Sequence, residues 1–201
     1  MDRETLAFYD REPGRYAETV AELLPDGPPE LRVFADALAP GSRVLDFGAG
    51  HGWAAAWLAA QGFAAEATDG SAGLAAEGKR RYGLDIRVAP FDALDAEAAY
   101  DGIWCSFALL HDTEEAFPGH IARLARALKP GGLLYLGMKE GEGTVRDRLG
   151  RRYFYIAEAA LREALTAAGF EDPDIRRDAA KGLAGKVEPC LHAFARLKAA
   201  A

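Results

Sequence analysis

The hydrophobic and polar positions of this chain follow two alternating periods. From residue 43 onward, short apolar runs typical of buried strands alternate with stretches whose apolar residues recur every three or four positions, as in amphipathic helices. Strands are predicted at residues 43–47, 63–68, 86–88, 100–106 and 133–138, and helices at 53–60, 72–82, 116–128 and 157–168. Strands that alternate with helices predict a mainly parallel sheet with helices on its faces, an α/β fold.

The two ends of the chain depart from this alternation. Residues 5–38 are predicted as helices that are interrupted at Pro13 and by the prolines of residues 25–29. Near the other end, strand candidates at 174–177 and 191–198 follow each other without a helix between them. Such a pair is expected to form a hairpin, which places one antiparallel strand in the sheet. The length is that of a single domain.

Composition and charge narrow the class of protein. The 201 residues carry a formal net charge of −7, with 27% charged side chains, a balance typical of a globular domain. The acidic residues are spread along the chain, and a negative surface repels phosphate backbones, so a nucleic acid partner is disfavoured. Residues 146–152 form the one small basic patch in the sequence.

The cysteines, the first residues and the apolar stretches bear on the compartment of the protein. Cys105 and Cys190 lack the spacing of a zinc site or a disulfide framework, so no metal is expected. The first residues lack the basic head and apolar run of a signal peptide, and no apolar stretch is long enough to span a bilayer. We therefore expect a cytoplasmic protein that does not bind membranes, either a monomer or a homodimer.

A glycine loop, FGAGHG at residues 47–52, follows the first predicted strand. Glycines let the backbone turn sharply and let a ligand approach it closely, and open α/β sheets bind ligands beside this turn. A dinucleotide site needs the pattern G-x-G-x-x-G, but the third glycine position is Trp53, whose indole would obstruct close packing of helix and strand. The G-x-G-x-G spacing favours an adenosyl sulfonium over a pyrophosphate.

An acidic residue ends the second predicted strand. Asp69 follows the glycines by about twenty residues, where an acid typically binds ribose hydroxyls. Its carboxylate can accept two hydrogen bonds from a vicinal diol. A glycine loop alone is weak evidence for a ligand site, but the loop, the acid and the order of strands together predict a cofactor site.

These residues resemble class I S-adenosylmethionine-dependent methyltransferases. Residues 44–52 look like the first motif of that family, residues 67–71 like its ribose-binding acidic loop, and residues 124–138 like its helix, turn and fifth strand. The resemblance implies a Rossmann-like seven-stranded mixed sheet of order 3-2-1-4-5-7-6, with strand 7 antiparallel. It implies one methyltransferase domain over 1–201, in which 1–40 form a helical cap over the cofactor, as in small-molecule and tellurite-type members, and the Rossmann-like core spans 41–201.

The resemblance also implies the cofactor, S-adenosylmethionine, and the residues that hold it. Asp69 is expected at the ribose, Asp92 at the adenine amino group, and Cys105 and Ser106 at the methionine end through backbone atoms. The cofactor contacts expected on this basis are Tyr16, Asp46, Gly48, Ala49, Gly50, Asp69, Gly70, Ser71, Phe91, Asp92, Cys105 and Ser106.

Several of these positions have a structural alternative. Asp46 either orients the loop amides and the methionine amino group or caps the following helix. His51 either touches the cofactor carboxylate or simply begins that helix, and Asp92 can instead be the N-cap of the segment that follows it. Phe47 departs from the smaller aliphatic residue that the family more often has, and it can crowd the end of the strand.

The residues expected to bind the methyl acceptor form less specific motifs than those expected to bind the cofactor. His111 follows the fourth strand and titrates near physiological pH, so it is a candidate catalytic base, with a structural hydrogen-bonding role as the alternative. Lys139 opens a glycine-rich segment expected to be a mobile loop, and arginines interleaved with aromatics follow it. That mixture can clamp an anionic or planar substrate, or can be solvated charges and core aromatics. The candidate substrate contacts are Tyr9, Lys139, Arg151 and Tyr153.

The function predicted from these features is methyl transfer to a small molecule. A module that binds S-adenosylmethionine without transferring methyl, and an enzyme that methylates tRNA or protein, stay open as alternatives. A nicotinamide-dependent oxidoreductase is disfavoured by Trp53 and by the lack of an obvious Tyr-x-x-x-Lys pair.

Overall fold

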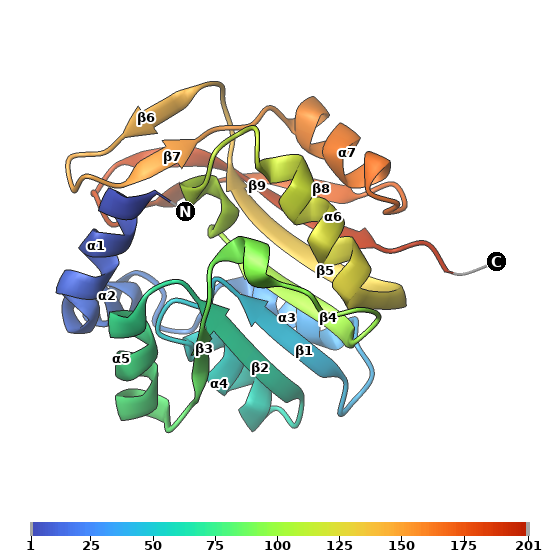
Figure 1. Ribbon diagram of the computed structural model, residues 1–201, viewed down its shortest axis with the longest axis horizontal. Coiled ribbons are helices and arrows are strands. Elements are labelled where there is room, and N and C mark those ends of the chain that lie inside the picture. Colours follow the sequence, from blue (N-terminus) through green and yellow to red (C-terminus); the bar gives the residue numbers. More distant parts are fainter. Residues whose placement is uncertain (1, 200–201) are drawn as a thin grey trace.

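A seven-stranded sheet runs through the centre of the molecule in a computed structural model that describes residues 2–199 (Figure 1). Its strands are β1 (Arg43–Phe47), β2 (Ala64–Asp69), β3 (Ile86–Val88), β4 (Tyr100–Ser106), β5 (Leu128–Lys139), β8 (Asp174–Lys181) and β9 (Val187–Arg196). The order across the sheet is β3-β2-β1-β4-β5-β9-β8, and only β9 runs antiparallel to its neighbours. Counted along this sheet, the order is 3-2-1-4-5-7-6 with strand 7 antiparallel, so the predicted fold is confirmed.

Helices cover both faces of the sheet because its strands bury apolar side chains on both sides. On one face lie α3 (Pro29–Asp36), α4 (Trp53–Ala60) and α5 (Ala72–Tyr82), and on the other α6 (Phe117–Ala127) and α7 (Glu158–Ala167), with short 3₁₀ turns η1 (Phe91–Ala93) and η2 (Leu109–His111). Successive strand residues point to opposite faces. Trp104 and Tyr135 accordingly pack toward α3 and α4, whereas Ile103 and Leu134 join the larger core beneath α6 and α7.

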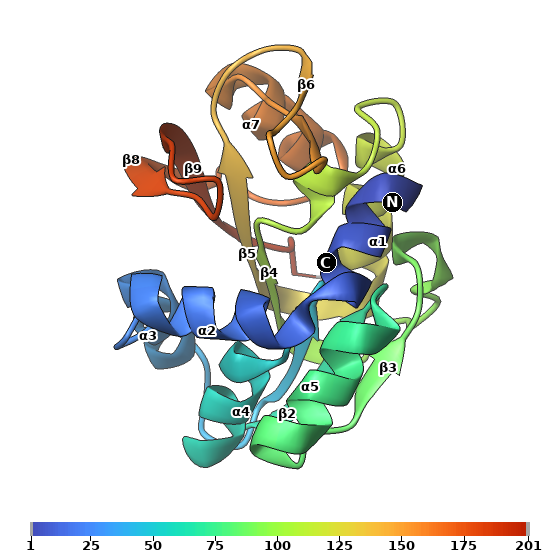
Figure 2. The ribbon, with the colours of Figure 1, turned by 90° about the vertical axis from the view of Figure 1, so that its left-hand side faces the viewer.

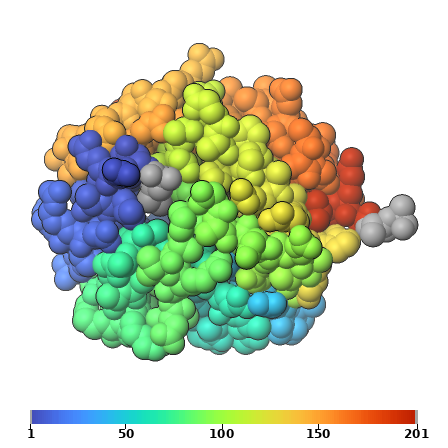
Figure 3. Space-filling view, in the orientation of Figure 1, coloured from blue at the N-terminus to red at the C-terminus, as the bar shows by residue number. Residues whose placement is uncertain are grey.

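Two N-terminal helices lie across the carboxyl ends of the central strands (Figure 2). These are α1 (Arg3–Arg11) and α2 (Pro13–Leu23), and the proline begins the second helix because its missing N–H is not needed in a first turn. Asp10 holds α1 against α5, since its Oδ1 accepts from Ser71 Oγ at 2.6 Å and from Gly73 N at 2.9 Å. Figure 3 shows this N-terminal segment, in blue, covering one side of the molecule.

A small antiparallel hairpin, which the sequence does not predict, follows β5. It consists of β6 (Thr144–Arg146) and β7 (Arg152–Phe154), paired only with each other. Strands of three residues rich in charge carry no periodic signal, which is why this region reads as a loop. The hairpin is tied to α1, because the Arg152 amide donates to Thr5 Oγ1 at 2.9 Å and Arg146 pairs with Asp2 at 2.9 Å.

Other predicted elements differ from the structure mainly at their ends. The C-terminal hairpin is longer than the 174–177 and 191–198 expected, and β5 begins at Leu128 rather than at residue 133, with Gly131 at φ of +78° inside it. Phe47 is accommodated by packing against Phe91, with ring centroids 5.4 Å apart. No helix within residues 2–199 has the length and apolar character needed to cross a membrane.

Two helical glycines provide a test of this packing. A Cβ at Gly78 in α5 would lie 2.5 Å from Ile86 Cδ1 and 2.8 Å from the His51 carbonyl oxygen, whereas one at Gly119 in α6 would meet nothing within 4 Å. We expect Gly78→Ala to lower the free energy of unfolding by ~1–3 kcal/mol through overpacking. Gly119→Ala should raise it by roughly 0.5–1 kcal/mol, because alanine is the better helix former. Urea denaturation measures both, and a stabilising Gly78→Ala would contradict the docking of α5.

Candidate cofactor and acceptor site

The glycine loop is held in place by the neighbouring strand. Gly48 and Gly50 have φ of +73° and +58°, a region that favours glycine. A Cβ on Gly48 would lie 2.2 Å from the Cβ of Ala108, so no larger residue fits. The amides of Gly48 and Ala49 both donate to the Thr68 carbonyl at 2.9 Å. These amides therefore serve the fold and are not free to cradle a phosphate.

Asp69 joins the glycine loop to the turn after β2. Its Oδ2 accepts from the Gly50 amide and its Oδ1 from the Ser71 amide, both at 2.8 Å. Burial raises the pKa of Asp69 to about 6 even though these amides favour the charged form. With the Gly50 amide also taken, the loop lacks the free N–H groups that a pyrophosphate site needs. This supports the sequence argument against a dinucleotide.

Asp46, at the end of β1, is a second buried carboxylate. Its Oδ2 accepts from the Ala55 amide, in the first turn of α4, at 3.1 Å, so the capping alternative is present in the structure. Burial raises the pKa of Asp46 to about 7. Among residues 2–199, neither Asp46 nor Asp69 forms an ion pair with a basic side chain. Two buried carboxylates without cationic partners suit a positively charged ligand, such as one with a sulfonium and an ammonium group.

A cavity of about 460 Å³ joins the glycine loop to the predicted acceptor residues. This volume lies in the range of roughly 300–1,000 Å³ found for small-molecule sites. From the predicted cofactor contacts it is lined by Tyr16, Asp46, Gly48, Ala49 and Ser106. From the acceptor candidates it is lined by Tyr9, His111, Lys139, Arg151 and Tyr153. The structure thus brings both predicted groups to one cavity.

The other predicted cofactor contacts do not line this cavity. They are Gly50, Asp69, Gly70, Ser71, Phe91, Asp92 and Cys105. Asp69 is only 7% exposed beneath α1, so contact with a ribose requires the covering side chains to move. Cys105 is fully buried, which raises the pKa of its thiol to about 12 and excludes it as a nucleophile. The roles of these seven residues stay predictions.

His51 points away from the cavity. Its ring packs against those of Tyr16 and Tyr82, with centroids 5.6 and 5.8 Å apart, and the residue is 2% exposed. Burial lowers the pKa of His51 to about 4, so the ring is neutral at physiological pH. Of the two alternatives for His51, this geometry favours the structural one.

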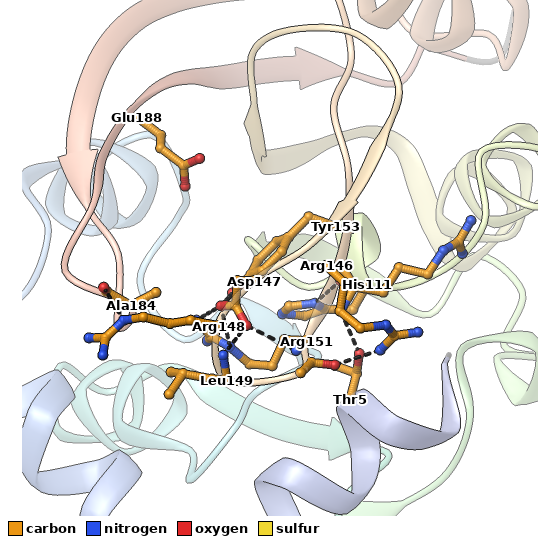
Figure 4. Close-up of polar contacts among 12 residues, drawn as sticks. Thr5, His111, Arg146, Asp147, Arg148, Leu149, Arg151, Tyr153, Ala184 and Glu188 are labelled. Carbon is orange, nitrogen blue, oxygen red and sulfur yellow. Dashed lines mark hydrogen bonds and ion pairs between the residues drawn. The ribbon is translucent and has the colours of Figure 1, made fainter.

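His111 belongs to a buried hydrogen-bonded chain, part of which is shown in Figure 4. Its Nδ1 lies 2.8 Å from the Arg152 carbonyl, which can only accept, so Nδ1 carries the proton and Nε2 accepts from the Tyr9 hydroxyl at 2.9 Å. Arg151 donates to the same hydroxyl at 3.2 Å and pairs with Asp147 at 2.7 Å. Burial lowers the pKa of His111 to about 3. Both ring nitrogens are therefore occupied, so His111 lines the cavity but can exchange a proton with a ligand there only through the Tyr9 hydroxyl.

The cations at the acceptor end are neutralised within the protein. Lys139 pairs with Glu188, and its Nζ lies 3.7 Å from the centroid of the Tyr153 ring. Arg151, already paired with Asp147, lies over the same ring at 5.2 Å. Such groups offer N–H donors and an aromatic face without a net positive charge.

His192 is a titratable residue of the cavity that is not among the residues predicted from the sequence. His192, in β9, lines the cavity together with Tyr135 and Glu30. It lies inside a predicted strand and outside every motif. The only feature of the sequence that could have indicated His192 is that a polar residue interrupts a run that is otherwise largely apolar.

Comparisons with known proteins agree with this geometry. A family model described as a methyltransferase domain matches residues 44–132. The demethylmenaquinone methyltransferase of Beutenbergia cavernae is 38% identical over 108 residues, which cover 51% of this chain and 44% of that protein. The chain thus spans less than half the length of the curated relatives it matches.

Solved structures extend the similarity over nearly the whole chain. The 1,6-didemethyltoxoflavin N1-methyltransferase of Burkholderia thailandensis, solved with 1,6-didemethyltoxoflavin and S-adenosylhomocysteine, is 28% identical with a TM-score of 0.75, covering 96% of this chain and 85% of that one. A TehB-like methyltransferase of Corynebacterium glutamicum shares the fold at 21% identity and a TM-score of 0.67, covering 93% and 98%. The family and cofactor inferred from the sequence are thereby confirmed: residues 44–132 match a methyltransferase domain, and the fold around them is that of the class I, Rossmann-like S-adenosylmethionine-dependent methyltransferases.

Proposed function

We propose that this chain transfers the methyl group of S-adenosylmethionine to a small-molecule acceptor. The observation that carries the proposal is the cavity of about 460 Å³, which is lined both by Asp46 and the glycine loop and by Tyr9, Arg151 and Tyr153. A methyl donor and an acceptor bound against these two groups of residues would share one enclosure.

In this proposal the buried carboxylates and the strand ends hold the cofactor. Asp46 attracts the ammonium group of its methionine portion, and Gly48 and Ser106 line the path of the reactive methyl. Asp69 receives the ribose hydroxyls once the side chains above it move. Gly70, Ser71, Phe91 and Asp92 are assigned to the adenosine portion by the family resemblance.

The acceptor end suits a small planar molecule. Tyr9 and Tyr153 provide aromatic surface, and Arg151 and Lys139 provide N–H donors whose charges are already balanced. The two methyltransferases with identified substrates are named for small molecules, demethylmenaquinone and 1,6-didemethyltoxoflavin, which supports the same class here. Methyl transfer of this kind is an in-line displacement that needs mainly alignment and exclusion of water.

Action on tRNA or protein is the weaker alternative. The basic patch at 146–152 consists largely of engaged side chains, since Arg146 pairs with Asp2 and Glu4, and Arg151 with Asp147. The net charge of −7 also opposes binding to phosphate backbones. A module that only binds S-adenosylmethionine would share every cofactor contact, and transfer itself distinguishes it.

Isothermal titration calorimetry with S-adenosylmethionine, S-adenosylhomocysteine and NAD tests the proposal first. We expect micromolar binding of both adenosyl ligands and none of NAD, because the loop amides are engaged. Asp69→Ala should weaken adenosyl binding by about 10- to 100-fold, since hydrogen bonds to a charged group contribute roughly 1.5–3 kcal/mol. Asp85→Ala, at an exposed carboxylate paired with Lys79, is the matched control and should leave affinity unchanged. Absence of binding to protein freed of endogenous ligand would contradict the proposed site.

The affinity for S-adenosylmethionine should depend on pH through Asp46. Its carboxyl has a pKa of about 7 in the free protein, so it is neutral below that pH and attracts the ammonium group only above it. We therefore expect affinity to rise as pH increases through about 7 and binding near that pH to release a proton. Calorimetry in buffers of different ionisation enthalpy measures the proton. In Asp46→Asn this rise should disappear, and an unaltered profile would remove Asp46 from the ammonium site.

Tyr9→Phe and His111→Gln test how His111 contributes. Because a proton from the cavity reaches His111 Nε2 only through the Tyr9 hydroxyl, we expect equal losses of turnover in the two variants, with cofactor affinity kept. Turnover is measured as S-adenosylhomocysteine formed with 1,6-didemethyltoxoflavin as probe acceptor. A much larger loss in His111→Gln would indicate that His111 itself is the catalytic base, and unchanged turnover in both would remove the pair from the mechanism.

A further inference from the structure

Glu30 is a carboxylate in the wall of the cavity that accepts no hydrogen bond from residues 2–199. It lies in the first turn of α3, and its side chain is 18% exposed. In the described part of the chain, the sealed-off polar side-chain atoms without a partner all belong to histidines, so both Glu30 oxygens are accessible. The two other carboxylates that line the cavity, Asp46 and Asp178, each accept from a backbone amide. The acceptor capacity of Glu30 is thus available to a ligand.

The polar groups nearest to Glu30 are engaged elsewhere. Its Oε1 lies 4.0 Å from His192 Nδ1, too far for a hydrogen bond, and that nitrogen contacts the Tyr135 hydroxyl at 2.8 Å. The Tyr135 hydroxyl also accepts from Ser106, so its own proton is donated to His192 Nδ1. No N–H of the His192 ring is therefore directed at Glu30, and no lysine or arginine of the described chain comes within ion-pair distance of it.

The balance of charge in the cavity favours a ligand with N–H donors beside Glu30. The two largely buried cations of the cavity, Lys139 and Arg151, are already paired with carboxylates of the protein, whereas the charge of Glu30 is not compensated. A carboxylate binds most strongly to a planar group that presents two parallel N–H bonds and carries positive charge. A hydroxyl would satisfy one oxygen and leave the charge unbalanced, and an anion would be repelled.

Aromatic side chains border the same part of the cavity. Phe107, just after β4, lines the cavity and meets the His192 ring edge to face at 5.7 Å. Its φ of +53° lies in the left-handed region, which is costly for a bulky residue and is tolerated where surrounding contacts impose it. Those contacts come from Gly137, whose carbonyl accepts from the Phe107 amide at 3.0 Å and where a Cβ would lie 3.1 Å from the Phe107 ring. A planar ligand thus finds aromatic surface close to Glu30.

We propose that Glu30 recognises the methyl acceptor, and that this acceptor is a planar nitrogen compound with an amidine-like pair of N–H groups directed at the carboxylate. The inference rests on the proposed function and narrows its class of acceptor. Glu30 binds and orients the acceptor in this arrangement and takes no part in proton transfer. Planar compounds of the same shape that lack N–H groups gain nothing from Glu30.

Calorimetry with 2-aminobenzimidazole as the probe, on protein saturated with S-adenosylhomocysteine, tests the role of Glu30. We expect the wild type to bind this probe and to prefer it to 2-methylbenzoxazole, which has the same shape without N–H groups. Glu30→Gln should weaken binding of 2-aminobenzimidazole by about 10- to 100-fold, the usual effect of losing hydrogen bonds to a charged group, and should leave 2-methylbenzoxazole unaffected. Asp178→Asn is the matched control, because it removes a negative charge from an exposed side chain that lines the same cavity and is already bonded to an amide. No binding of the probe, no preference for it, or equal losses in the two variants would overturn the proposal.

The affinity for S-adenosylhomocysteine, measured first, separates this role from the proposed function. We expect the same Kd in the wild type, Glu30→Gln and Asp178→Asn, and a thermal midpoint of Glu30→Gln lowered by a few degrees at most, through the lost interaction with the N-terminus of α3. Weaker binding of S-adenosylhomocysteine in Glu30→Gln alone would place Glu30 at the cofactor and overturn its role at the acceptor. Failure of the wild type to bind S-adenosylhomocysteine would instead overturn the proposed function, together with everything that rests on it.

Discussion

The conformation of the glycine loop depends on the buried carboxylate of Asp69. By accepting from the amides of Gly50 and Ser71, it fixes the ends of β1 and β2 relative to each other and sets the glycine loop in its left-handed conformation. The carbonyl of Thr68, on the same strand as Asp69, accepts from the amides of Gly48 and Ala49. The loop thereby becomes a close-approach surface without free anion-binding amides, and its nearby charge is negative. A cationic adenosyl ligand suits this arrangement, and a pyrophosphate does not.

A second constraint acts at the acceptor end, where buried cations have to be compensated. Lys139 and Arg151 stand at the cavity wall only because Glu188 and Asp147 pair with them, since an unpaired buried charge is strongly destabilising. The hairpin of β6 and β7 supplies Arg151, just before β7, and Tyr153, and α1 supplies Tyr9, so two segments far apart in the sequence line the same cavity. The enclosure that methyl transfer requires is thus a product of the N-terminal helices docking on this hairpin.

The two histidines of the cavity differ through their neighbours rather than their type. His111 has a carbonyl on one nitrogen and a hydroxyl on the other, so its bonding capacity is used within the fold. His192 has a hydroxyl on one nitrogen, and its other nitrogen is buried with no hydrogen-bond partner among residues 2–199. The sequence marks His111 because a histidine there follows the fourth strand. His192 differs from other buried residues only through its hydrogen-bond partners, which the sequence does not show.

The sequence by itself determined most strands and helices, the glycine loop and Asp69, because these depend on local periodicity and on short-range spacing, and its motifs carried the family resemblance that implied the sheet order and the cofactor. It did not give the β6–β7 hairpin, since three-residue strands have no periodicity to detect, nor the covering of Asp69 by α1, which depends on Asp10 meeting Ser71 across 61 residues. The engagement of His111 and the free nitrogen of His192 likewise depend on partners distant in sequence. Side-chain chemistry can be read along the chain, but whether a polar group is satisfied is decided by the atoms that folding places next to it.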